Sequence, residues 1–265
     1  MKGGKRPLGY TIIEVMIVLA VSGVMFLIAA NFISGKQERT SFTQGVNEMA
    51  SRIQDTIEQI NDGKYSDIPL NCSFNGVAVS FGGPTTVQGT NSTCVFLGKM
   101  LHFSVSGVPH NYETLSLAGG RVDASNNLSP TLTSVDPTVI DPLTVNQTTS
   151  QQLAVNTMSV TDTLGAIHNG NFGFGFTQGL GTSNGVGNFQ SGAQAISMVY
   201  APISSGMSHA QAVAHINGHV AYAQSATICL TDGTQLARIV IGGTGANGNQ
   251  LSVNVQRINP GAPCP

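Results

Sequence analysis

The chain has 265 residues, enough for one large domain or two small ones, and only 9% of them are charged, against about 25% in ordinary globular domains. This low charge, together with 32 glycines and long stretches of Ser, Thr, Asn and Gln, is not typical of a cytosolic enzyme. The net charge is −2 and no Lys or Arg lies between Arg121 and Arg238, which speaks against nucleic-acid binding because phosphate contacts need clustered basic side chains.

The first element in chain order is a long apolar run. Residues 15–35 are uncharged, and a helix of that length spans roughly 30 Å, the thickness of the hydrocarbon core of a bilayer. The run is longer than the roughly 7–15 apolar residues of a removable secretory signal. Lys2, Lys5 and Arg6 precede it. These observations predict a single membrane-spanning helix with its N-terminus in the cytoplasm and the body outside.

Glu14 lies beside this apolar run. A carboxylate next to a membrane-length segment costs a few kcal/mol unless it reaches the interface or finds a partner. Two roles are therefore open for Glu14. It is either an interfacial charge of an ordinary signal anchor or an acid that pairs with a cation outside its own helix.

The block from Lys5 to Val21 resembles the class III signal of type IV pilins and type II secretion pseudopilins. It has a short basic leader ending in Gly9, an aromatic residue at Tyr10, and then Thr-Ile-Ile-Glu-Val before the apolar helix. The resemblance implies cleavage after Gly9 by a prepilin peptidase, N-methylation of Tyr10, and pairing of Glu14 with the terminal amine of a neighbouring subunit. This chain has Tyr10 where most members have Phe, and Asn31 where many filament-forming pilins have Pro.

The helix is expected to continue beyond the apolar run. Apolar residues recur at spacings of three and four, which places them on one helical face: Phe42, Val46, Met49, Ile53, Ile57 and Ile60. Gly63 is expected to cap the helix. The predicted organisation is a leader at residues 1–9, a long helix at 10–62 whose part 10–34 forms the membrane or filament core, and an extracytoplasmic body at 63–265.

After the helix the pattern changes to short segments with β-branched or alternating apolar residues, separated by Gly, Pro and Asn. Strands are predicted at residues 76–81, 93–97, 100–105, 113–117, 193–200, 226–230, 236–241 and 251–256. A long helix followed by antiparallel strands predicts an α+β fold, in which the helix packs on a pilin-like roll. Residues 121–190 are rich in Thr, Ser, Asn, Gln, Gly and Pro, and we expect a variable insertion of irregular strands and loops there.

The four cysteines are Cys72, Cys94, Cys229 and Cys264, and they allow three pairings. Disulfides are the expected state in an exported body. The favoured pairs are Cys72–Cys94 and Cys229–Cys264, since each pair flanks one local β unit. The second pair would join the C-terminal tail to the sheet, as the C-terminal disulfide loop does in many pilins.

Other motifs give weaker signals. The GxGxxG match at residues 243–248 precedes a strand-like segment, whereas a dinucleotide site needs a helix there. His209, His215 and His219 could bind a metal ion, but no acidic residue is near them in the sequence. Asp136 and Asp141 could bind calcium together with loop carbonyls, but they lack the EF-hand spacing. No catalytic constellation is found, so neither an enzyme activity, a metal nor a cofactor is expected.

The leading hypothesis is a structural subunit of a type IV pilus or related filament. It would be held in the cytoplasmic membrane, processed by prepilin peptidase, and passed by an inner-membrane assembly platform into an extracellular filament with copies of itself or other pilins. A mature chain longer than the ordinary major subunit favours a minor or adhesive pilin. The alternatives are a binding module whose insertion contacts a surface, glycan or DNA, a pseudopilin of a secretion or competence system, and a signal-anchored surface protein.

Overall fold

The computed structural model describes residues 11–62, 72–74, 79–81, 94–120, 132, 135–178, 196–242, 251–258 and 264. Contacts divide the chain into two units, Met1–Thr43 and Gln44–Pro265. Each unit is described by itself below. The chain is an α+β protein in which a long N-terminal helix precedes a large antiparallel sheet, as the sequence predicts.

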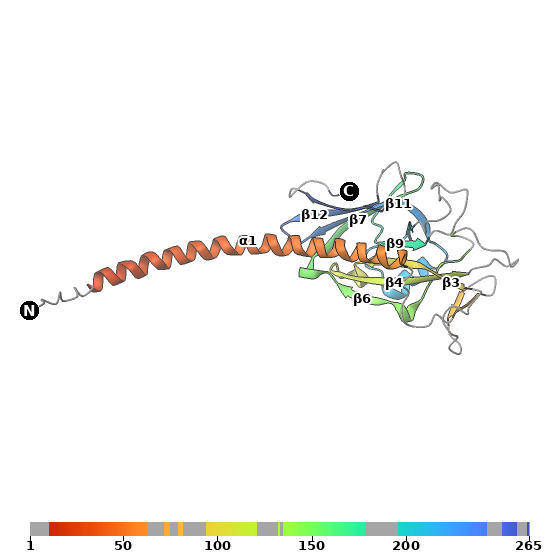
Figure 1. Cartoon of the computed structure of the whole chain (residues 1–265), viewed down its shortest axis with the longest axis horizontal. Coiled ribbons are helices and arrows are strands. Elements are labelled where there is room, and N and C mark those ends of the chain that lie inside the picture. Colours follow the sequence, from red (N-terminus) through yellow and green to blue (C-terminus); the bar gives the residue numbers. More distant parts are fainter. Residues whose placement is uncertain are drawn as a thin grey trace, which may run out of the picture. The chain divides into compact units, whose positions relative to one another are not determined.

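The long helix α1 runs from Ile12 to Asn61, and it is drawn as one continuous ribbon in Figure 1. Thr11 caps its N-terminus, because the Thr11 hydroxyl oxygen accepts the backbone N–H of Glu14 at 3.3 Å. Both helix ends agree with the prediction. Gly63, the expected C-terminal cap, lies outside the described residues.

In the second unit, α1 from Gln44 onward lays its predicted apolar stripe on the sheet. Val46, Met49, Ile53 and Ile60 are buried. Three polar contacts along this part of α1 support the packing: Arg52 Nη1 donates to the Tyr112 hydroxyl at 3.2 Å, Lys99 Nζ to Gln59 Oε1 at 2.5 Å, and Gln178 Nε2 to the Ile60 carbonyl at 3.3 Å.

The main sheet of the described residues has eleven strands, with the order β13-β12-β11-β10-β9-β3-β4-β5 along its main path and with β6, β7 and β8 paired off that path. Every pairing is antiparallel. The strands are β3 (Cys94–Phe103), β4 (Asn111–Gly120), β5 (Thr138–Val139), β6 (Val145–Thr148), β7 (Ala154–Asp162), β8 (Ile167–Asn169), β9 (Gly173–Gln178), β10 (Ile196–Tyr200), β11 (Ala221–Thr231), β12 (Leu236–Gly242) and β13 (Val253–Ile258).

Shorter elements complete the body. β1 (Cys72–Phe74) and β2 (Val79–Phe81) form a separate antiparallel pair. The second helix is α2 (His209–Ile216), and the 3₁₀ turns are η1 (Val105–Gly107), η2 (Asp141–Leu143) and η3 (Ser150–Gln152).

The face of the sheet that carries α1 has an aromatic core. Phe103 stacks on Tyr112 and on Phe174, with ring centroids 5.6 and 5.9 Å apart, and Phe174 meets Phe176 edge to face at 5.8 Å. All four side chains are buried. Because Tyr112 also accepts the hydrogen bond from Arg52, this core is tied directly to α1.

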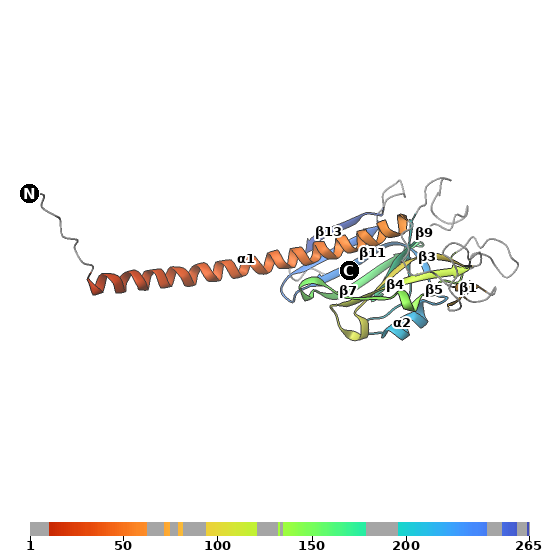
Figure 2. The ribbon, with the colours of Figure 1, turned by 60° about the horizontal axis from the view of Figure 1, so that its bottom comes forward.

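The opposite face of the sheet is covered by α2, as Figure 2 shows. Ala212 and Ile216 of α2 are fully buried in a cluster with side chains of β3, β4 and β10: Leu97, Met100, Leu115, Leu117 and Val199. The strands β3 and β4 therefore have buried apolar side chains on both faces.

The structure differs from the sequence expectation in two places. The segments predicted at 93–97 and 100–105 form one strand, β3, with an irregularity between Phe96 and Gly98. The predicted insertion was expected to hold irregular strands and loops; its described part supplies β5 to β9, which belong to the main sheet, and β9 lies between β10 and β3 within it. A glycine is needed at Gly175, because a Cβ there would lie 2.3 Å from the Lys99 carbonyl oxygen of the neighbouring strand.

The C-terminal tail is joined to the sheet by a disulfide between Cys229 of β11 and Cys264, with the Cα atoms 6.2 Å apart. This is the pairing that the sequence favours. Cys94 is also disulfide-bonded. The side chain of Cys72 lies outside the described residues, so the Cys72–Cys94 pairing stays a prediction.

Candidate functional site

The first candidate site is the N-terminal part of α1. Gly9 and Tyr10, the predicted processing residues, lie outside the described residues. Glu14 lies in the first turn of α1, where its backbone N–H is held by the Thr11 cap. A carboxylate in this position is favoured by the partial positive charge of the helix N-terminus. The helix therefore presents Glu14 in a fixed position close to the predicted mature terminus.

The carboxylate of Glu14 is exposed, and it makes no hydrogen bond or ion pair within the described part of the chain. Its neighbours on both sides, Ile13 and Val15, are apolar and exposed. An acid set among apolar side chains becomes costly wherever water is excluded. The cation that would compensate it must then come from outside this helix.

Residues Ile12–Ala29 form the one helix in the described residues that is long and apolar enough to cross a membrane. None of its side chains is buried within the molecule. Ile12, Phe26 and Met25 are 81%, 74% and 67% exposed. The polar hydroxyl of Ser22 donates to the Val18 carbonyl at 2.6 Å, so it is satisfied inside the helix. A helix that is apolar on all sides needs a lipid or protein environment.

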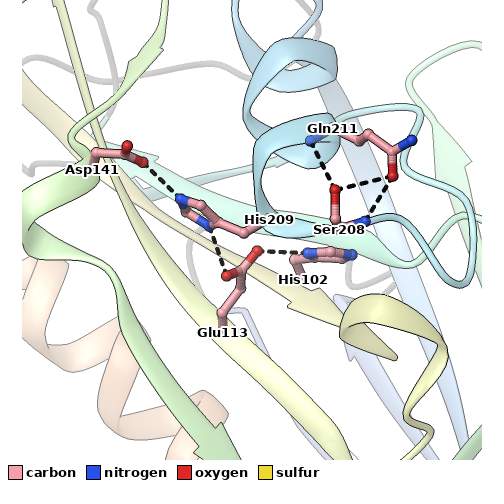
Figure 3. Close-up of polar contacts among 6 residues, drawn as sticks. All are labelled: His102, Glu113, Asp141, Ser208, His209 and Gln211. Carbon is pink, nitrogen blue, oxygen red and sulfur yellow. Dashed lines mark hydrogen bonds and ion pairs between the residues drawn. The ribbon is translucent and has the colours of Figure 1, made fainter.

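The second candidate site is a set of four ionisable side chains in the body, shown in Figure 3. Glu113 of β4 is its centre, with one oxygen 2.7 Å from Nδ1 of His102 on β3 and the other 2.8 Å from Nδ1 of His209 on α2. Nε2 of His209 lies 2.7 Å from a carboxylate oxygen of Asp141 in η2. We call these residues, His102, Glu113, Asp141 and His209, the histidine cluster.

The electrostatics of the histidine cluster follow from burial and pairing. The side chains of His102 and Glu113 are fully buried. Burial opposes ionisation of Glu113, but the hydrogen bonds from His102 and His209 outweigh it and hold the pKa of Glu113 below its ordinary value. Burial likewise opposes the charge on His209, but the hydrogen bonds to Asp141 and Glu113 prevail and raise the pKa of His209. Glu113 and His209 therefore each favour the charged form of the other.

The structure brings together only part of what the sequence singled out. His209 and Asp141 meet in the histidine cluster, whereas His215 and His219 are exposed on and beyond the end of α2. Sequence reasoning missed His102 and Glu113. Each is an ionisable side chain in a strand that also holds other polar residues, and the two face one another only through the β3–β4 register, which the sequence alone does not give.

The histidine cluster is not arranged as a metal site. Each ring nitrogen of His209 already faces a carboxylate, so neither has a lone pair directed at an open position. In the described residues, no group of three or more His, Cys, Asp or Glu side chains could hold a metal ion. The GxGxxG match at 243–248 falls outside the described residues, and the strands on either side of it, β12 and β13, pair as an antiparallel hairpin.

A third feature of the body is a polar groove of about 440 Å³ beside α1. Arg52 of α1 and the Tyr112 hydroxyl line it, together with backbone and side chains of the β4 and β6 strands. The remaining lining residues are Val105, Asn111, Asn146, Gln147 and Thr148. The charge of Arg52 is balanced by Glu48, which accepts from its guanidinium at 2.8 Å. The groove is therefore close to neutral and rich in carboxamide and hydroxyl groups.

Comparison with known proteins identifies the N-terminal region. Residues 4–30 match the family model described as the prokaryotic N-terminal methylation motif. No curated protein and no solved structure matches the chain. The matched residues include the basic leader, Gly9, Tyr10 and Glu14 as well as the first turns of the apolar helix. The N-terminus of this chain therefore carries the class III prepilin signal of type IV pilins and pseudopilins.

Proposed function

We propose that this chain is a structural, non-catalytic subunit of a type IV pilus or a related filament. The observation that supports it is the N-terminal methylation motif at residues 4–30, followed by an apolar helix whose side chains are all exposed. The prepilin would be anchored in the cytoplasmic membrane with its N-terminus inside. Cleavage after Gly9 and methylation of Tyr10 would then produce the mature subunit for assembly into a surface filament.

Assembly would bury Ile12–Ala29 among the same helices of neighbouring subunits. Each buried side chain that leaves lipid gains packing contacts, and the Glu14 carboxylate would accept the positive terminal amine of the neighbouring Tyr10. A carboxylate at the end of an apolar helix costs a few kcal/mol when water is excluded and it has no partner. A cost of that size corresponds to roughly a hundredfold in an association constant, so pairing also sets the register between subunits.

The first experiment is the intact mass and N-terminal sequence of the protein recovered from its native envelope or from sheared surface material. The proposal expects a chain that begins at methylated Tyr10. A chain that still begins at Met1 would refute processing and would favour a signal-anchored surface protein with Glu14 as an interfacial charge.

The second experiment tests the role of Glu14. Glu14→Ala should be processed and folded like the wild type but should lose most of its incorporation into filaments, measured by immunoblot of the sheared fraction. Glu38→Ala is the matched control, because Glu38 is an exposed acid of the same helix. Normal incorporation of the Glu14→Ala protein, or equal loss in both variants, would remove Glu14 from the assembly mechanism.

Two finer roles follow from the same helix, and experiments must separate them. A pseudopilin of a secretion or competence system would form a short filament, and its deletion should abolish cargo release or DNA uptake rather than surface piliation. A minor pilin should be found in sheared pili at a small fraction of the major subunit. Quantitative mass spectrometry of the sheared material distinguishes these cases.

A second candidate function, surface binding by an adhesive pilin, is favoured by the polar groove. Its near-neutral carboxamide and hydroxyl lining suits a neutral polyhydroxylated ligand such as a glycan, since each hydroxyl of a sugar both donates and accepts. Asn111→Ala with Gln147→Ala should abolish binding on a glycan array while leaving piliation intact. Asn254→Ala, on the exposed strand β13, is the control. Unchanged binding would exclude the groove.

A further inference from the structure

The contacts of His209 require its imidazole ring to be protonated and positively charged. An ionised carboxylate carries no hydrogen to donate, so both contacts of the His209 ring are hydrogen bonds only if both of its nitrogens are protonated. The ring faces Glu113 of β4, Asp141 of η2 and, beyond Glu113, His102 of β3, as Figure 3 shows. No other ionisable side chain of the described residues contacts it.

The helix itself gives His209 no reason to be charged. His209 is the first residue of α2, and the partial positive charge at a helix N-terminus disfavours a cation there. Ser208 and Gln211 satisfy two of the free N–H groups of this end, their own, through a capping box. The two carboxylates are therefore what stabilise the imidazolium, and the imidazolium in turn links α2 to β4 and η2.

Helix α2 depends on such contacts. It has eight residues, too few for a helix that is stable alone in water. Its side of the interface is small, with only Ala212 and Ile216 fully buried against the sheet. The link through His209 fixes the end of α2 that these two side chains do not anchor. If the link weakens, the cluster of Leu97, Met100 and Leu115 loses part of its cover.

We propose that His209 is a proton-dependent latch, which holds α2 on the sheet while the ring is protonated and releases its N-terminal end when the ring loses a proton. A neutral imidazole has one N–H, so it can donate to Glu113 or to Asp141 but not to both. The lone pair of its other nitrogen would then face a carboxylate oxygen. The contact that was attractive becomes repulsive at one of the two acids.

The pH window follows from the directions of the shifts. Since the pKa of His209 is raised, its contribution is complete below the ordinary histidine value of about 6.5 and is lost as the pH rises through the raised value. Since the pKa of Glu113 is lowered, its contribution is present above the ordinary glutamate value and is lost as the pH falls through the lowered value. The latch is closed at mildly acidic pH and opens as the pH rises through the raised pKa of His209.

Hydrogen exchange of the full-length protein in detergent micelles tests the latch. The reporters are amides at the N-terminal end of α2, such as that of Ala212, which donates to the Ser208 carbonyl. Between about pH 5.5 and about pH 9 their protection factors should fall by up to about tenfold per pH unit between the ordinary histidine value and the raised pKa of His209, and should level off above it, because one proton is linked to release only in that window. Protection of the β11 amides should not change.

Two variants decide the outcome. His209→Gln, which is neutral at every pH, should show low α2 protection throughout and lose the pH dependence. His168→Gln is the control: His168 of β8 pairs with Asp162 of β7, and this variant should keep the wild-type profile. Constant α2 protection in the wild type, or an unchanged profile in His209→Gln, would overturn the proposal. If His209→Gln does not fold, Asp141→Asn decides: loss of one acid should move the midpoint to lower pH, and an unmoved midpoint would refute the latch.

Discussion

Removing the disulfide between Cys229 and Cys264 should destabilise the whole body. The bond closes a loop with a sequence separation of 35 residues, and this loop contains β12 and β13 at the end of the sheet. In the chain-entropy argument, a loop of this size restricts the unfolded chain by about 4 kcal/mol. Cys229→Ala combined with Cys264→Ala removes the constraint without leaving a thiol.

The expected change is a fall in Tm of roughly 8–16 °C, since 1 kcal/mol corresponds to about 2–4 °C in a domain of this size. Calorimetry and circular dichroism of the full-length protein in detergent measure it. The variant should also have a larger denaturant m-value, because the unlinked unfolded chain exposes more surface. Wild-type protein in reductant serves as the comparison. Reductant breaks every disulfide, including that of Cys94, whereas the double variant lacks only the Cys229–Cys264 bond.

Destabilisation of β13 alone, without a fall in the stability of the whole body, would refute this reasoning. β13 is the outer strand of the sheet path and has mostly exposed side chains, so it could detach alone when the tail is released. In that case hydrogen exchange would increase only in β13, and Tm would change by less than about 2 °C. The bond would then act on a local segment, and the chain-entropy value would not apply to the body.

Two further predictions concern the centre of the sheet. Phe174→Ala should lower the free energy of unfolding by about 3–5 kcal/mol, measured by chemical denaturation, because a fully buried ring that contacts two other phenyl rings is removed. A loss below about 1 kcal/mol would mean that neighbouring side chains move in and fill the cavity. Gly175→Ala should also destabilise the body, because its Cβ would meet the Lys99 carbonyl oxygen at 2.3 Å, whereas Gly23→Ala should not, since nothing lies within 4 Å of a Cβ there.

The helix could be predicted because its signal is repeated many times. An apolar run of membrane length and a stripe at spacings of three and four fix both its existence and its buried face, and Val46, Met49 and Ile53 are buried as expected. The outer strands were also predictable, since β-branched residues alternate there between turns. These signals are local, so they need no knowledge of which strand pairs with which.

The strand β9 in the middle of the sheet could not be predicted from local sequence patterns. β9 has the sequence Gly-Phe-Gly-Phe-Thr-Gln, and glycine and glutamine usually indicate a loop. In the sheet, Gly175 is required by the close approach of β3, and the neighbouring phenylalanines supply the apolar face. The contacts that exclude a side chain lie far away in the sequence, on β3 for Gly175 and at Ile203 for Gly173, so composition alone assigned this segment to an insertion.

The histidine cluster was hidden for a similar reason. His102, Glu113, Asp141 and His209 come from four different elements, with separations of 11, 68 and 96 residues between the bonded pairs. The sequence analysis grouped His209 with His215 and His219 because they are close in the chain. The fold instead turns His209 toward an acid of β4. Pairing between distant strands decides such sites, and no local pattern encodes it.

Glu14 and Glu113 show how a chain with few charges can use an acid in two ways. Both lie among apolar side chains, where an uncompensated carboxylate is costly. The body supplies Glu113 with a donor for each oxygen, so its charge is satisfied within one subunit and stabilises the fold. The described part of the chain supplies Glu14 with none. The same energetic need is thus met internally for Glu113, whereas our proposal assigns it to a neighbouring subunit for Glu14. Loss of Glu113 should therefore affect folding, whereas loss of Glu14 should affect only assembly.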